Sequence, residues 1–237
     1  MQNKNYFLVT QTPLRISFLG GGTDMKKFNE KHPGAVLSVA INKFVYVIIK
    51  KHNVLFKENI RLNYSVTEHV KNTSQIKNNI IIDCLKKYPI IFPFYVSIVS
   101  DVPSNTGLGS SSSITVGVLK ALHEIRGEKV SPQKLAEEAC DIEINLLKNT
   151  PGKQDQYAAA IGGLNFFIFK KKKVIVHKIK NLKKIDEFLS KSILIWTGQY
   201  RKASKILIKQ NKDTKKNLLY LKKMYELSVK GFELAKK

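Results

Sequence analysis

Pro103-Ser-Asn-Thr-Gly-Leu-Gly-Ser-Ser-Ser-Ser113 is the most informative stretch of this 237-residue chain. It follows the apolar run Phe94–Ser100, which predicts a strand, and precedes a helical apolar pattern from Ile114 to Ile125. A loop in that position lies at a helix N-terminus, where unpaired backbone N–H groups and the positive end of the helix dipole attract phosphate. Gly107 and Gly109 would let the backbone approach the phosphates closely, and the Gly-Lys-Ser/Thr of a Walker A loop is missing. A serine-rich cap on an ordinary core helix is the alternative, but capping needs one serine rather than four. The stretch therefore predicts a phosphate-binding loop.

Two further segments combine glycines with an acidic residue. In Gly152-Lys-Gln-Asp155-Gln-Tyr, a carboxylate on a glycine turn could orient or deprotonate an attacking hydroxyl. An Asp in a turn also serves as a helix cap, so both interpretations stay open for Asp155. In Pro13-Leu-Arg15-Ile-Ser-Phe-Leu-Gly-Gly-Gly-Thr-Asp24, the glycines permit close backbone approach to a ligand, and Thr23 and Asp24 could bind sugar hydroxyls. A glycine-rich turn with an Asx cap fits this second segment equally well.

The remaining pattern predicts mixed α and β structure. Strands are expected at Phe7–Thr10, Arg15–Leu19, Ala35–Ile41, Phe44–Lys50, Asn165–Lys170, Val174–Ile179 and Ser192–Trp196, and helices at Asn72–Lys87, from Ser131 to about Leu147, at Gln156–Ile161 and over much of Ala203–Lys237. Asn42-Lys43 predicts a tight hairpin turn, and Lys170–Lys173 forms the tip of a second hairpin. A soft domain boundary is expected near Lys184.

The composition bounds the class of protein. Apolar residues make up 43% of the chain, which is enough for a packed core. Two cysteines, Cys84 and Cys140, are too few for a disulfide framework and are not spaced as a zinc site. The N-terminus lacks the apolar stretch of a signal peptide, and no apolar run approaches the ~18 residues of a membrane span. We therefore expect a cytoplasmic protein with no membrane partner.

The net charge is 41 − 18 = +23, which raises the question of nucleic-acid binding. Only four of the basic residues are arginines, the type that phosphate and base recognition favours, and the lysines are scattered. The composition therefore predicts no nucleic-acid partner. A positive field would still favour an acidic ligand such as ATP or a sugar phosphate.

Taken together, the three motifs resemble the GHMP kinase superfamily. Residues 103–113 resemble its Pro-x-x-x-Gly-Leu-Gly-Ser-Ser motif, which binds ATP phosphates. A finer match is to the branch of D-glycero-D-manno-heptose 7-phosphate kinases and fucokinase-like proteins. The first motif of that branch resembles residues 13–24, PLRISFLGGGTD, and a later motif resembles residues 152–163, GKQDQYAAAIGG. The resemblance covers residues 12 to about 210. It implies an α+β fold, with a ribosomal protein S5 domain 2-like N-terminal domain (1–185) and a ferredoxin-like C-terminal domain (186–237) that is incomplete.

The resemblance also implies roles for individual residues. Asp155 matches the catalytic aspartate, and Arg15 matches a basic residue of the first strand that lies near it. Ser111 and Glu143 match the residues that bind Mg²⁺, although Glu143 alone would also fit a solvated helix face. The residues that match sugar contacts are Gly21, Gly22, Thr23 and Asp24. Those that match the ATP-binding loop are Pro103, Gly107, Leu108, Gly109, Ser110, Ser111 and Ser112.

The implied activity is an ATP-dependent kinase that phosphorylates the anomeric hydroxyl of D-glycero-D-manno-heptose 7-phosphate. A kinase for fucose or another unphosphorylated sugar, an inactive protein that only binds nucleotide or sugar, and an RNA-binding module are the alternatives. The chain departs from the family because no Gly-Ala-Gly-Gly-Gly-like loop follows Gly198. A fragment, or a short form that completes its sheet as a homodimer, would explain this departure, and a fragment is favoured.

Overall fold

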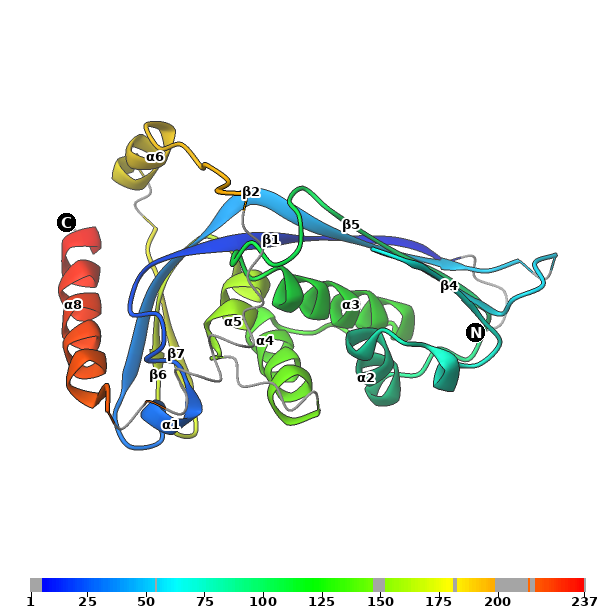
Figure 1. The fold of residues 1–237 in the computed structure, drawn as a ribbon, viewed down its shortest axis with the longest axis horizontal. Coiled ribbons are helices and arrows are strands. Elements are labelled where there is room, and N and C mark those ends of the chain that lie inside the picture. The colour runs from blue at the N-terminus through cyan, green and yellow to red at the C-terminus, as the bar shows by residue number, and fades with distance from the viewer. Residues whose placement is uncertain are drawn as a thin grey trace.

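Two long strands, β1 (Phe7–Leu19) and β2 (Gly34–Lys51), form the centre of the fold. The computed structural model describes residues 6–53, 55–146, 152–180, 183–198, 213 and 216–236. In these residues one sheet has the strand order β4-β3-β5-β2-β6-β7, and β1 pairs with β2 in addition. The N-terminal half of β2 pairs with β6, its C-terminal half pairs with β5, and β1 runs antiparallel along both halves. Figure 1 shows both long strands arching over the molecule.

The arch contains a bulge where the sequence predicted a hairpin. Pro13 pairs with Phe44 and Arg15 pairs with Ala40, so β2 carries two more residues than β1 in this interval. Asn42 and Lys43 lie in the extra length and are exposed. A bulge bends a strand and increases its twist without ending it. The predicted hairpin at Asn42-Lys43 is therefore wrong: β2 continues through these residues, and the two predicted strands are one.

The other elements match the predictions in part. They are α1 (Lys26–Asn29), β3 (Ile60–Asn63), β4 (Thr67–Val70), a 3₁₀ turn (Thr73–Gln75), α2 (Asn79–Lys87), β5 (Phe94–Ser100), α3 (Ser110–Arg126), α4 (Pro132–Cys140), a π-helical turn η2 (Asp141–Leu146), α5 (Gln154–Ile161), β6 (Leu164–Phe169), β7 (Val174–Lys178), α6 (Lys183–Ser190) and α8 (Leu218–Lys236). Three of these elements, α1, β3 and β4, were not predicted. The strands predicted at Phe7–Thr10 and Arg15–Leu19 are one strand, and the helix predicted at Asn72–Lys87 is divided into a 3₁₀ turn and a shorter α-helix. The Ser131 side chain accepts a hydrogen bond from the Lys134 N–H, as expected for an N-cap before a proline at the first helical position.

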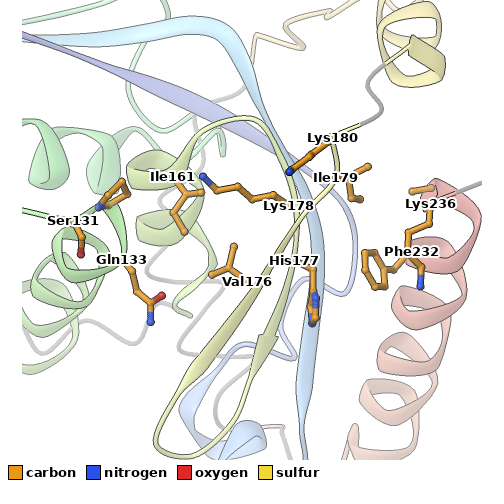
Figure 2. A pocket seen from close by; sticks show the side chains of 12 residues that line it. Ser131, Gln133, Ile161, Val176, His177, Lys178, Ile179, Lys180, Phe232 and Lys236 are labelled. Atoms are coloured by element: carbon orange, nitrogen blue, oxygen red, sulfur yellow. The ribbon is translucent and has the colours of Figure 1, made fainter.

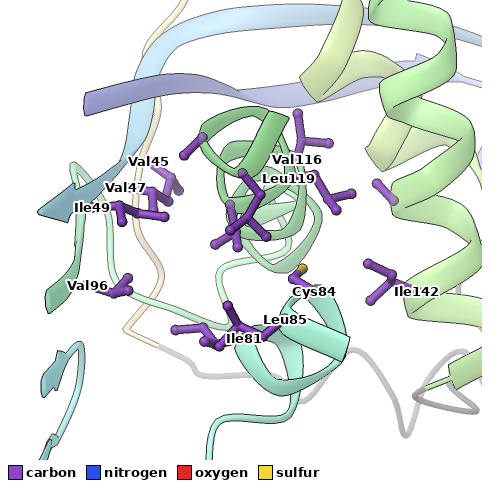
Figure 3. Close-up of a cluster of buried hydrophobic side chains, with 14 of the residues drawn as sticks. Val45, Val47, Ile49, Ile81, Cys84, Leu85, Val96, Val116, Leu119 and Ile142 are labelled. Carbon is purple, nitrogen blue, oxygen red and sulfur yellow. The ribbon is translucent and has the colours of Figure 1, made fainter. Parts of the chain in front are cut away.

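The main core lies between α3 and the sheet (Figure 3). Val45, Val47 and Ile49 alternate along β2, so their side chains share the face that α3 covers. Val116 and Leu119 of α3 pack against them, and α2 adds a further layer with Ile81, Cys84 and Leu85. Burial of these side chains fixes α3, and with it the loop that precedes α3.

Both faces of the N-terminal half of β2 are covered. Val36 packs with Tyr157 of α5 and Phe167 of β6 in one cluster, while the neighbouring Leu37 belongs to a second cluster with Tyr225, Val229 and Phe232 of α8. Figure 1 shows α8 on the opposite side of β6 and β7 from α4 and α5. Because each face is covered, this half of β2 reads as a continuous apolar run rather than an alternating one.

The C-terminal part differs from the prediction. Ser192–Trp196 was expected to be a strand, but no strand is assigned after β7 in the described residues. Ile193, Leu194 and Ile195 are largely exposed (85, 57 and 77%), and a strand forms only where a partner supplies its ladder of hydrogen bonds. The ferredoxin-like unit is therefore not seen in this part, and the helix predicted around Ile206 lies outside the described residues. Within the described residues, no helix is both long and apolar enough to cross a membrane.

Candidate active site

The predicted phosphate loop joins β5 to α3. Gly107 and Gly109 have positive φ angles of 79° and 81°, and Gly109 is the residue immediately before the helix. In this conformation a side chain would be strained, whereas glycine is not. The backbone N–H groups of the first turn have no acceptor within an α-helix, so they face the loop as donors for an anion.

The four serines form the first turn of α3 rather than part of the loop, and they divide into two pairs. Ser110 is half-buried and Ser111 is exposed, so their hydroxyls lie near solvent. Ser112 and Ser113 are buried: the Ser112 hydroxyl donates to Glu143 Oε2 (3.0 Å), and the Ser113 hydroxyl donates to the Pro13 carbonyl (2.9 Å). Two of the four hydroxyls therefore hold the loop against the protein rather than facing a ligand.

Arg15 and Asp155 form an ion pair beside the loop. Arg15 Nε and Nη2 lie 2.8 and 2.7 Å from Asp155 Oδ1, and Arg15 Nη1 donates to the Gly107 carbonyl (2.8 Å). A Cβ atom added at Gly109 would lie 3.4 Å from Arg15 Cγ and 3.5 Å from Asp155 Cγ. Burial would lower the pKa of Arg15, but the charge and hydrogen bond of Asp155 outweigh it, so the pKa is raised. The first strand, the loop and the later aspartate therefore meet, as the motifs predicted.

Glu143 lies beneath the start of α3. Its side chain is buried on η2, and its Oε1 atom has no hydrogen-bond partner in the described residues. Burial raises the pKa of Glu143 to about 7; the hydroxyls of Thr115 and Ser112 oppose the rise, and the charge of Asp155 adds to it. The Gln156 amide is near this carboxylate but makes no hydrogen bond of normal geometry with it.

The predicted metal ligands, Ser111 and Glu143, are placed differently from one another. The Glu143 carboxylate accepts a hydrogen bond from Ser112, the neighbour of the predicted ligand Ser111. Ser111 itself faces outward in the first turn of α3. Mg²⁺ usually takes one or two carboxylates together with waters and substrate phosphates. A buried carboxylate with an unpartnered oxygen next to a phosphate loop suits that chemistry. In the described residues, no group of three or more His, Cys, Asp or Glu side chains could hold a metal without such additional ligands.

The glycine turn Gly20–Asp24 keeps its two polar side chains inside the protein. The Thr23 hydroxyl lies 2.8 Å from the Gly20 carbonyl and 3.0 Å from the Ala35 carbonyl, and it accepts a hydrogen bond from the Ala35 N–H (3.0 Å). Asp24 is 1% exposed, while Gly21 and Gly22 are half-buried. Of the four predicted sugar contacts, only the two glycines are open to solvent in this structure.

Gln154 and Ser17, which no sequence motif marks as functional, hold the Asp155 segment. The Gln154 N–H donates to Asp24 Oδ2 (3.0 Å), and the Ser17 hydroxyl donates to Gln154 Oε1 (2.7 Å). The contact from Ser17 to Gln154 joins residues 137 positions apart, and no local pattern marks it. The only sequence signal for Gln154 is its place beside Asp155.

Neither Arg15 nor Asp155 lines the groove along β7 or the hollow beside Asp24. The groove has a volume of about 890 Å³ and follows β7 between α4 and α8. Val176 and Lys178 lie on one face of β7, and His177 and Ile179 lie on the other (Figure 2). None of the predicted site residues is among those that line it. A second hollow, of about 270 Å³, is lined by Asp24, Lys153, Tyr157 and Lys171–Lys173 among others.

Comparison with known proteins decides the family. Residues 71–163 match the family described as GHMP kinases N terminal domain. The chain is 36% identical over 211 residues to the D-glycero-alpha-D-manno-heptose 7-phosphate kinase of Campylobacter jejuni. Residues 71–163 therefore form a GHMP kinases N terminal domain. The resemblance predicted from the three motifs is confirmed.

Solved structures agree with this assignment. A D-glycero-D-manno-heptose 1-phosphate kinase from Bacteroides thetaiotaomicron has a TM-score of 0.72 at 26% identity, with 92% of this chain and 74% of that chain covered. A putative sugar kinase from Campylobacter jejuni has a TM-score of 0.68 at 29% identity, covering 96% and 78%. The α+β fold is thereby confirmed. The alignment with the curated Campylobacter kinase covers 83% of this chain but only 61% of that protein, so this chain spans less than two thirds of its relative.

Proposed function

We propose that this chain is the ATP- and sugar-binding part of a sugar kinase, which phosphorylates D-glycero-D-manno-heptose 7-phosphate at its anomeric hydroxyl. The observation that carries the proposal is the contact of the Arg15–Asp155 pair with the phosphate loop, where Arg15 donates to the Gly107 carbonyl. Phosphoryl transfer needs a positioned nucleophile beside a site that neutralises phosphate charge, and these elements meet here. The name of the Campylobacter relative supports the choice of substrate.

In the proposed reaction, Asp155 binds the anomeric hydroxyl. Arg15 holds Asp155 through Oδ1, and Oδ2 has no hydrogen bond in the described part of the chain, so this oxygen can accept the proton of the hydroxyl. The anomeric oxygen then forms a bond to the γ-phosphorus of ATP, the bond from that phosphorus to the β–γ bridging oxygen breaks, and ADP leaves. The N–H groups at the start of α3 stabilise the phosphate charge.

Glu143 would hold Mg²⁺ through its Oε1 atom, which is unpartnered among the described residues, and the exposed Ser111 hydroxyl stays a predicted second ligand. The ion would neutralise charge on the phosphates of ATP. The chain's own contribution is to keep the Glu143 carboxylate buried and fixed by Ser112.

A coupled assay of ADP release across a panel of sugars and sugar phosphates tests the proposal. We expect turnover with the heptose 7-phosphate, loss of turnover on chelation of Mg²⁺, and a loss of roughly a hundredfold or more in Asp155→Asn with ATP affinity retained. Turnover with fucose or another unphosphorylated sugar would support the alternative kinase. ATP binding without turnover on any sugar would instead indicate a binding protein.

The division into an N-terminal domain (1–185) and a partial C-terminal domain (186–237), the cytoplasmic location and the homodimer remain predictions. Limited proteolysis tests the first, cell fractionation the second and sedimentation equilibrium the third.

A further inference from the structure

Asp24 is a buried carboxylate, and among the described residues its hydrogen bonds come from two backbone N–H groups and one amide side chain. Oδ1 accepts from the Gly22 N–H (3.1 Å) and lies 3.5 Å from Gln154 Nε2, and Oδ2 accepts from the Gln154 N–H (3.0 Å). The residue is 1% exposed. Its carboxylate therefore joins the glycine turn to a segment 130 positions later in the chain.

The segment before Asp155 lies directly on this carboxylate. A Cβ atom at Gly152 would lie 1.7 Å from Asp24 Oδ2, so a side chain there would displace the carboxylate. The backbone from Gly152 to Gln154 is thus in van der Waals and hydrogen-bond contact with Asp24. Only glycine allows this approach at position 152.

Gln154 is held from a second side by β1. Ser17 donates to Gln154 Oε1 at 2.7 Å, and Ser17 lies two positions after Arg15, on the same face of the strand. Arg15 binds Asp155 directly, while Asp24 and Ser17 bind the residue before it. The carboxylate of Asp155 is therefore fixed by one direct contact and by two contacts that act through Gln154.

We propose that Asp24 is a positioning residue that holds the Gly152–Gln154 turn and thereby sets the place of Asp155. In this role Asp24 does not bind the sugar, so its contribution differs from the one that its motif implied. The inference rests on the proposed function, because it takes Asp155 as the group that binds the reacting hydroxyl. A displacement of about 1 Å in such a group can lower the rate roughly a hundredfold.

The charge of the surroundings agrees with this role. Arg15 and Asp155 both interact electrostatically with Asp24. The other charged residues around it line the same hollow as Asp24: Lys26, Glu30, Glu137, Asp141, Lys153 and Lys171–Lys173. Burial raises the pKa of Asp24 to about 6, the hydrogen bond from the Gln154 N–H opposes this rise, and the charge of Asp155 adds to it. Near pH 7.5 the carboxylate therefore carries its charge and can accept both backbone N–H groups.

Three variants and one control test the inference. Asp24→Asn places an amide NH₂ group against backbone donors, Gly152→Ala disturbs the same contact from the other partner, and Ser17→Ala removes the second contact to Gln154. Asp83→Asn is the control, since Asp83 is also buried but pairs with Lys86 on α2. Heptose 7-phosphate affinity is measured by calorimetry without ATP, kcat and KM by ADP release, and backbone mobility by hydrogen exchange of the peptide 152–161.

We expect Asp24→Asn and Gly152→Ala to lower kcat roughly tenfold to a hundredfold. Sugar affinity and the KM for ATP should stay within about threefold, and exchange of peptide 152–161 should become faster. The double variant Asp24→Asn/Gly152→Ala should have a kcat no lower than that of the slower single variant, because the two changes break the same contact. Asp83→Asn should lower thermal stability without changing kcat, and Ser17→Ala gives a milder version of the same loss if the other variants do not fold.

Two results would overturn the inference. A loss of sugar affinity as large as the loss of kcat would make Asp24 a sugar ligand, and an unchanged kcat in variants with lower melting temperatures would make it merely structural. Failure of the proposed function would be distinguished by the unmodified chain, which would then release no ADP. That result would overturn the inference as well.

Discussion

The Arg15–Asp155 pair should contribute measurably to stability, and the structure sets the size of the effect. Two N–H groups reach one carboxylate oxygen at 2.8 and 2.7 Å, and the side chains are 14 and 23% exposed. A hydrogen bond to a charged group is worth about 1.5–3 kcal/mol. Sharing one oxygen and removing both charges from water reduce the sum, so we expect a coupling energy of about 2 kcal/mol between the two side chains.

A double-mutant cycle with Arg15→Met and Asp155→Asn measures this coupling through the free energy of unfolding in urea. Arg15→Met alone should cost about 3 kcal/mol, since it also removes the hydrogen bond to the Gly107 carbonyl (net about 1 kcal/mol). Asp155→Asn should cost about 2 kcal/mol. The double variant should lose about as much as Arg15→Met alone, because the second change then breaks nothing further.

The exposed pair Lys120–Glu124 on α3 is the matched control. It has the same 2.7 Å separation, but its side chains are 40 and 50% exposed. Its cycle should give about 0.3–0.5 kcal/mol, and added salt should reduce that value more than the value for Arg15 and Asp155. A coupling for Arg15 and Asp155 no larger than that of the control would refute the reasoning from burial.

Three further predictions concern the buried polar groups. Thr23→Val should lower the free energy of unfolding by about 1–3 kcal/mol, because it leaves the Ala35 N–H without its acceptor, whereas Thr23→Ser should retain most of the stability in the same urea titration. Ser112→Ala should cost about 1–2 kcal/mol by removing the donor to Glu143, and the exposed Ser111→Ala should be nearly neutral by thermal denaturation. The pKa of Asp24 is raised to about 6, so between about pH 4 and 6 the folded chain binds more protons than the unfolded chain, and stability should fall by about 3 kcal/mol as the pH rises through that window. The free energy of unfolding should depend less on pH across this range in Asp24→Asn than in the unmodified chain. An equal pH dependence in both proteins would contradict a raised pKa of Asp24.

The parts of the fold that the sequence predicted well are those set by local pattern. β5 matches its predicted range, and α3 contains the whole predicted apolar pattern, although the helix begins at Ser110, inside the serine run that was predicted to be loop. The cap at Ser131 also follows from local chemistry alone. In these cases propensity, periodicity and end signals agree with the tertiary structure.

The errors arose where distant pairing overrides a local signal. Asn42-Lys43 looks like a turn, but β1 pairs with β2 on both sides of it, so the same residues form a bulge. Ser192–Trp196 has strand composition, but no strand is assigned to it in the described part of the chain. Composition therefore indicated which residues favour a turn or a strand, while pairing with distant strands determined the secondary structure that these residues form.

The site divides in the same way. The meeting of Arg15, Asp155 and the loop was predictable because three motifs of known order converge. The inward placement of Thr23 and the exchange of Ser112 for Ser111 beside Glu143 were not, because the orientation of a side chain depends on how each turn packs. Gln154 carried no signal of its own.

The bulge in β2 has a consequence for changes in chain length. β2 pairs with β6 before the bulge and with β5 after it, and the two extra residues lie between the two halves. Removing one residue there would shift one half by one position, so that every inward side chain of that half would point outward. Insertions and deletions should therefore be rejected at Asn42-Lys43 although both residues are exposed, whereas most solvent-facing turns absorb them. In this protein an exposed, turn-like dipeptide fixes the spacing between the part of the sheet that supports the phosphate loop and the part that supports the glycine turn.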